Sequence, residues 1–181
     1  QTTIGGFDIN AARVIIDYRD GRGQAKALIE GAGGAPFRVA ANADLQPQLW
    51  KVMLDGRVRG TPFRTASPAR IVPGKAGYEL LPTRIDMGRG NMRLAGNWSG
   101  GNAGRIKLES RLDALNLSII NAFVPGYGIG GQATGSLDFE QASPTAFPRA
   151  DARLSIDNFT RTTATSISQA VVALLPVPVA P

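Results

Sequence analysis

The sequence offers few side chains that could carry out chemistry. It contains no histidine and no cysteine, which excludes the commonest general base, thiol nucleophiles and thiolate metal sites. The remaining candidate nucleophiles or bases are Lys51, Lys107 and Ser110, and none has an evident activating partner. The 14 acidic residues include no pair with the spacing of a glycosidase-type dyad. We therefore predict that the chain is not an enzyme and that it uses no cofactor and no metal.

The net charge of +6 comes from 20 basic and 14 acidic residues. The basic residues occur singly and often near an acid, as Arg57 does near Asp55 and Arg111 near Asp113. A nucleic-acid-binding protein concentrates such charges on one helix or patch, so we predict no nucleic-acid partner. Solvated strand faces explain this pattern, which is also compatible with attraction to anionic lipid headgroups.

The segment GRIKLESRLDAL, residues 104–115, alternates apolar and charged residues. This period of two is typical of a β-strand with one face in water. A slip in the alternation near Ala11 and Ala12 predicts a β-bulge, and prolines between residues 62 and 82 predict short or interrupted strands. The same alternation recurs in residues 37–45, 50–58, 92–98, 133–139 and 150–156.

One segment, residues 117–124, has a helix-like spacing of apolar residues and ends at Pro125 and Gly126. No other helical pattern alternates with the strands, so the predicted fold is all-β. A sandwich, a closed barrel and an open trough all fit one-sided strands. The apolar rows are rich in Ala, Gly, Val and Leu and poor in aromatics, which favours the trough. We expect an elongated, curled antiparallel or mixed sheet, a β-taco, with one short helix.

The sequence RLDALNLSIINAFVPGYGIGGQATGSLDFEQASPTAFPRADARLSIDNFTRT, residues 111–162, resembles the TamB family of Gram-negative envelope proteins. The matching order is a strand ending in LDALNLS, a short helix ending in Pro-Gly, and a strand containing Gly131 and Gly135. A proline-containing link and a further alternating strand follow. The preceding strands share the family's general character.

This resemblance implies a periplasmic location, with the full-length protein anchored in the inner membrane. TamB-like proteins, whose architecture is similar to that of AsmA-like lipid transporters, cross the periplasm as a curled β-sheet. Their groove is thought to carry phospholipid acyl chains toward the outer membrane, and an Omp85-class outer-membrane protein is their partner in protein assembly and secretion. We expect residues 1–181 to be a single β-rich fragment of a longer envelope protein, without the family's anchor or partner-binding domain. We expect residues 163–181 to be a frayed or truncated tail.

An apolar trough would remove a large barrier to lipid movement. Exposing an acyl chain of roughly fifteen CH2 groups to water costs on the order of 10 kcal/mol. The alternative is a structural or adhesive β-solenoid or sandwich module in which the same residues form an ordinary core. The predicted lining residues are the inward rows of the strands: Phe37, Val39, Leu45, Val52, Leu54, Met92, Leu94, Ile106, Leu108, Leu112, Leu137, Phe139, Leu154 and Ile156.

Overall fold

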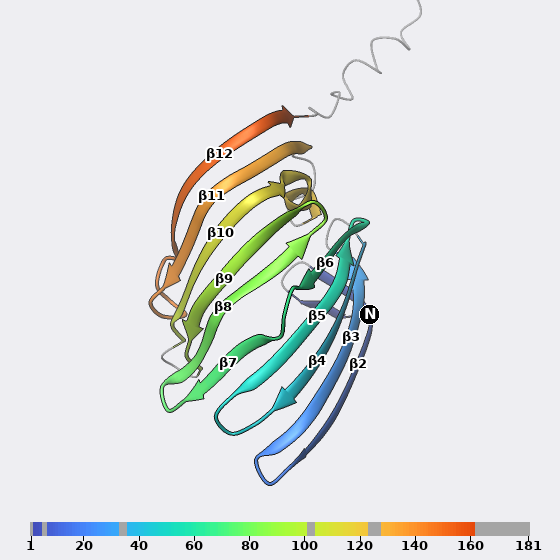
Figure 1. Cartoon of the computed structure of the whole chain (residues 1–181), viewed down its shortest axis with the longest axis vertical. Helices are drawn as coiled ribbons and strands as arrows, with labels where there is room; N and C mark the ends of the chain where they lie inside the picture. The colour runs from blue at the N-terminus through green and yellow to red at the C-terminus, as the bar shows by residue number, and fades with distance from the viewer. Residues whose placement is uncertain (1, 5–6, 33–35, 101–103, 123–127, 162–181) are drawn as a thin grey trace, which may run out of the picture.

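The computed structural model describes residues 2–4, 7–32, 36–100, 104–122 and 128–161 (Figure 1). They form one 12-stranded antiparallel sheet and a single 3-10 helix, η2. The predicted all-β fold is confirmed, and the predicted tail at 163–181 lies outside the described residues. The strands are β1 (Thr2–Ile4), β2 (Phe7–Arg19), β3 (Arg22–Ala32), β4 (Pro36–Leu45), β5 (Trp50–Val58), β6 (Thr61–Thr65), β7 (Ala69–Gly74), β8 (Gly77–Met87), β9 (Gly90–Trp98), β10 (Ile106–Asn116), β11 (Ile129–Gln141) and β12 (Arg149–Arg161); η2 is Leu117–Ala122.

The strands follow one another across the sheet in the order of the chain. Only β7 leaves this path. The short strands β6 and β7 lie one after the other between β5 and β8, and each pairs with both of them. Figure 1 shows the result as a bowed sheet that extends from β2 at one end to β12 at the other. Neither a barrel closure nor a second sheet occurs among the described strands.

Tight hairpins produce this up-and-down order. The turns at Asp20–Gly21 and Arg59–Gly60 each contain two residues with positive φ, 49° and 80° in the first and 52° and 80° in the second. A two-residue turn with both residues in the left-handed region matches the right-handed twist of the strands that it joins. Glycine at the second position takes this conformation without the steric cost of a Cβ.

The irregularities expected from the sequence lie where they were predicted. The register of β2 on β3 shifts between Ile9 and Ala11, which confirms the bulge. The proline-rich stretch forms the short strands β6 and β7, and the β8–β9 register shifts between Leu80 and Thr83, around Pro82. The predicted short helix begins at Leu117 but is a 3-10 helix, and positions 123 and 124 lie outside the described residues.

The two faces of the sheet differ in burial. We call the inner face the one that carries Leu108 and the cross-strand partners of its row. Every described strand residue that is buried lies on this face, including Thr65, Ala69 and Ala133, whereas the opposite, outer face carries most of the charges.

Candidate functional site

The strand registers bring the predicted lining residues onto the inner face. On β4 and β5, Val39 lies opposite Gly56 and Leu45 opposite Trp50. Farther along the sheet, Leu108 lies between Gly96 of β9 and Phe139 of β11. All fourteen predicted residues follow these same rows, on strands β4, β5, β9, β10, β11 and β12.

Strands β6, β7 and β8 join the two groups of rows and supply inner-face residues that the sequence reasoning missed. Phe63 lies opposite Gly56 and Met87, and Ile71 lies opposite Trp50 and Leu80. The prolines interrupted the alternation that would have identified them. A short alternating signal is nevertheless present in the sequence RIDM, where Ile85 and Met87 face inward. The apolar surface therefore continues across the whole sheet.

The inner face is only partly covered. Leu137, Leu154 and Ile156 are 40%, 39% and 45% exposed, and most other lining residues are half-buried. The principal contacts of each described strand are with its sheet neighbours, apart from β11, which also packs against η2. Within the described part of the chain, no second layer of strands or helices therefore seals the apolar rows.

The 3-10 helix closes one part of this face. Leu117 of η2 is 5% exposed and packs against Leu112 at 8% and Ala133 at 0%. The Asn116 side chain accepts a hydrogen bond from the Ser118 backbone N–H at 2.9 Å, which caps the start of the helix. Leu112 was predicted as a lining residue, and the structure places it in this small self-buried core.

The buried polar side chains on the described inner face, Thr65, Thr83 and Ser110, are satisfied by the protein itself. The Ser110 hydroxyl donates to the Leu137 carbonyl, and the Thr83 hydroxyl donates to the Leu81 carbonyl at 2.8 Å. The Thr65 hydroxyl oxygen accepts a hydrogen bond from the Leu54 N–H at 3.1 Å. Because these buried groups are already paired, the face presents an essentially apolar surface to anything placed against it.

Three aromatic rings line one lip of the inner face, where β5 begins, β8 begins and β9 ends. The ring centroids of Trp50 and Tyr78 lie 5.0 Å apart, and those of Tyr78 and Trp98 lie 5.5 Å apart. These separations are typical of favourable aromatic pairs. The three rings therefore form one aromatic cluster that joins β5, β8 and β9 at this lip.

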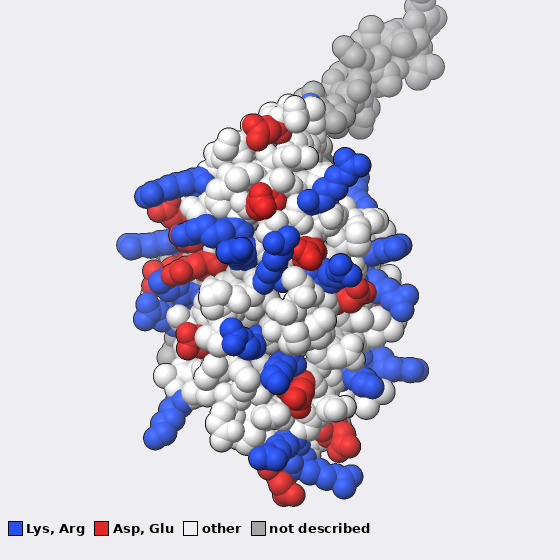
Figure 2. Space-filling view, in the orientation of Figure 1, with Lys and Arg blue, Asp and Glu red and all other residues white. Residues whose placement is uncertain are grey.

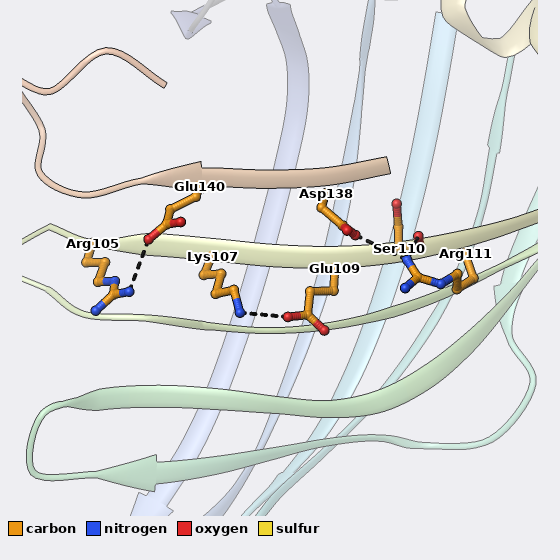
Figure 3. A network of polar contacts seen from close by, with 7 residues as sticks. All are labelled: Arg105, Lys107, Glu109, Ser110, Arg111, Asp138 and Glu140. Carbon is orange, nitrogen blue, oxygen red and sulfur yellow. Dashed lines mark hydrogen bonds and ion pairs between the residues drawn. The ribbon is translucent and has the colours of Figure 1, made fainter. Parts of the chain in front are cut away.

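The outer face carries a network of ion pairs on β10 and β11 (Figure 3). Arg105, the residue before β10, pairs with Glu140 of β11 at 3.1 Å, and Arg111 of β10 pairs with Asp138 of β11 at 3.3 Å. Lys107 pairs with Glu109 at 2.7 Å along β10. The hydrogen bond and the negative charge of Glu109 raise the pKa of Lys107 above its usual 10.5. These pairs are solvent-exposed, so each contributes little to stability.

One row of the outer face places like charges together. Arg93 of β9 lies directly opposite Arg84 of β8 and Arg111 of β10. Arg84 turns to Asp86 at 2.8 Å and Arg111 turns to Asp138, so acids on adjacent rows relieve part of the repulsion. Figure 2 shows the wider pattern on the visible face, where basic and acidic side chains are scattered and do not form one basic patch.

The candidate nucleophiles are not assembled into one site. Ser110 faces inward and Lys107 faces outward on the same strand, and their neighbours in the registers keep them on opposite sides of the sheet. Lys51 lies opposite Asp44 and Arg70 on the exposed outer face. The Ser110 hydroxyl donates to the Leu137 backbone carbonyl.

Comparison of the chain with models of known protein families, with curated proteins and with solved structures found no match. In the described part of the chain, no helix has the length and apolar character needed to cross a membrane.

Proposed function

We propose that this chain is a segment of a TamB-like, periplasm-spanning protein whose inner face conducts phospholipid acyl chains between the inner and outer membranes. In this proposal the full-length protein is anchored in the inner membrane and supports the assembly or secretion of outer-membrane proteins with an Omp85-class partner. The TamB resemblance of residues 111–162 motivates the envelope location, and the apolar face motivates the cargo.

The observation that carries the proposal is an apolar face that runs from strand to strand without a covering layer among the described residues. Phe37, Leu54 and Leu108 are half-buried on strands at different positions along this face. A soluble protein normally hides so large an apolar surface or uses it to bind something. A flexible hydrocarbon chain fits a long surface whose side chains are mostly apolar and whose buried side-chain polar atoms, among the described residues, are already paired.

The energetics also favour an acyl chain as the ligand. Each CH2 group that leaves water gains about 0.8 kcal/mol, so even a chain that is half-covered by the inner face gains several kcal/mol. The lining residues along the rows are apolar, from alanine to phenylalanine, so contact with an acyl chain is favourable at each point. A chain could therefore move across the sheet without a deep well to trap it.

Site-specific photocrosslinking tests the proposal. The full chain is produced in the periplasm of a Gram-negative host with p-benzoylphenylalanine in place of Leu137, and crosslinked lipid is identified by mass spectrometry. The matched control carries the same group in place of Ser136, the adjacent residue, which lies on the outer face opposite Arg111 and Arg153. We expect a phospholipid adduct at position 137 and none at position 136.

Crosslinking at Leu108 and Val52 extends the test to other strands of the sheet. An adduct at each inward position would indicate a continuous path. If inward positions give no more lipid adduct than outward positions, lipid conduction is wrong and the structural-module alternative is favoured.

A further inference from the structure

The tyrosines and tryptophans of the described chain gather at one lip of the inner face. We call it the aromatic lip: it is formed by the strand ends where Trp50 begins β5, Tyr78 follows the first residue of β8 and Trp98 ends β9. Tyr18, the last residue but one of β2, lies at the same lip, three cross-strand pairings from Trp50. Every tyrosine and tryptophan that the structure describes therefore lies along one side of the inner face.

The polar ends of three of these rings are available to a ligand. Trp50, Tyr78 and Trp98 are half-buried, and their indole N–H and hydroxyl groups make no hydrogen bond to another described residue. No buried side-chain polar atom in the described chain lacks a partner, so these three donors face water. Such rings suit the boundary between hydrocarbon and lipid headgroups, because the ring contacts the apolar chain while its polar end bonds to the headgroup.

A cation lies at the same lip. Lys75, in the turn between β7 and β8, is exposed and has no ion pair among the described residues. Together with Tyr78, Trp98 and Arg105 it lines an open hollow of about 980 Å³. Glu79 is the one acid among the described lining residues, and the register places it on the outer face. Because Arg105 is already held in an ion pair, the Lys75 ammonium is the cation that is available to an anion.

The opposite lip, where β5 ends and β9 begins, has a different character. Its turns carry the exposed arginines Arg59 and Arg89, but no tyrosine or tryptophan of the described chain. Near the end of β10, η2 covers the inner face, with Leu117 packed on Leu112 and Ala133. This cover stands in the path of a headgroup that moves from strand to strand along the opposite lip. Among the described elements, no helix covers the aromatic lip in the same way.

The inner face is wide enough to hold the tails of a lipid anchored at the aromatic lip. The nine residues of β9 span about 30 Å. Half of a bilayer's hydrocarbon core, the depth occupied by one set of acyl chains, is about 15 Å. Four residues separate Trp98 from Leu94, or about 13 Å. Tails that start at Trp98 therefore end near Leu94, on the uncovered part of the face.

We propose that a phospholipid lies on the inner face with its phosphate headgroup at the aromatic lip, beside Lys75, and its acyl chains along the strands toward the opposite lip. The rings of Trp50, Tyr78 and Trp98 contact the glycerol ester region and donate hydrogen bonds to its oxygens or to the phosphate. Because these rings belong to three strands, the headgroup keeps similar contacts as it passes from one strand to another. This inference rests on the proposed lipid carriage and adds to it the orientation of the lipid.

Tryptophan fluorescence tests this orientation in the natural sequence, whose only two tryptophans are Trp50 and Trp98. The full chain is loaded with phosphatidylcholine that carries a nitroxide quencher either on the headgroup or at the methyl end of an acyl chain. Gel filtration removes unbound lipid. We expect the headgroup label to remove most of the tryptophan emission and the tail label to leave most of it.

A matched control chain reads the opposite lip. Trp50→Phe and Trp98→Phe remove the natural fluorophores, and Phe37→Trp places one opposite Val58, at the end of β5. We expect the order of quenching to be reversed in this chain, with the tail label the stronger quencher. Circular dichroism checks that the control chain keeps its β-sheet.

A charge substitution tests the contact with the phosphate. We expect Lys75→Glu to weaken the binding of phosphatidylglycerol about fivefold at low salt, measured by fluorescence titration. The control is Lys26→Glu, which makes the same charge change on the outer face, opposite Asn42, and leaves binding unchanged. Glycerol phosphate, which has the anion but no acyl chain, should leave the tryptophan emission unchanged. If it binds as tightly as the lipid, the lip is a site for soluble phosphates and the assignment to a lipid headgroup is wrong.

The possible results separate the orientation from the proposed function. If lipid is retained but both labels quench both chains equally, the orientation is wrong and lipid carriage stands. Stronger quenching by the tail label in the natural chain would place the headgroup at the opposite lip, beside Arg59 and Arg89, and would also overturn the proposal. If neither chain retains lipid, the proposed function fails and the orientation fails with it.

Discussion

Replacing Leu108 by aspartate separates an open groove from a sealed core. Leu108 lies on β10 between Gly96 and Phe139, and its Cδ2 atom occupies the space beside Gly96, 2.9 Å from where a Cβ would lie on that glycine. The side chain is half-buried. A carboxylate at this position would therefore keep part of its hydration as long as no acyl chain covers it.

The magnitude follows from this partial burial. Full burial of a leucine side chain is worth about 2–3 kcal/mol, so Leu108→Asp removes about 1–2 kcal/mol of folding stability. If the same site were sealed, an unpaired buried carboxylate would cost several kcal/mol more. An acyl chain lying over residue 108 would desolvate the carboxylate, and a penalty of about 3 kcal/mol corresponds to a more than 100-fold loss of lipid affinity.

The assay combines urea unfolding, followed by circular dichroism, with mass spectrometry of lipid that co-purifies with the chain. The control is Asn97→Asp, which adds the same charge on the outer face, opposite Lys107. We expect Leu108→Asp to fold and to lose lipid, and the control to fold and to retain it. A variant that is destabilised by more than about 4 kcal/mol, or that folds and keeps its lipid, would refute the reasoning.

Three further predictions concern stability. Leu112→Ala opens a cavity beneath η2, so we expect it to destabilise the chain by about 2–4 kcal/mol in urea unfolding, clearly more than the same change at Leu94 on the uncovered part of the face. Arg93→Glu places an acid between two arginines, and we expect a gain of about 0.5–1 kcal/mol at low salt, which disappears in 1 M salt. The raised pKa of Lys107 means that its folded state holds the proton more tightly. Its stabilising contribution is therefore complete below the unfolded pKa and is lost as the pH rises through the folded value, above 10.5. An NMR titration of the Lys107 amine should show this raised pKa, and Glu109→Gln should lower it.

The sequence alone determined the elements of this protein and their two faces. The alternation in residues 104–115 identifies which side of β10 is apolar because the side-chain period of a strand is a local property of the backbone. The bulge near Ala11 and the short strands around the prolines are local for the same reason. The start of the helix at Leu117 was local too, because the Asn116 side chain caps it, but its 3-10 form was not predicted.

Only the tertiary structure decided which rows meet and which remain uncovered. Sandwich, barrel and trough use identical alternating strands, because an apolar row is equally satisfied by a second sheet, by closure or by a ligand. The cross-strand registers place Phe63 and Ile71 between two sets of rows that are far apart in the sequence.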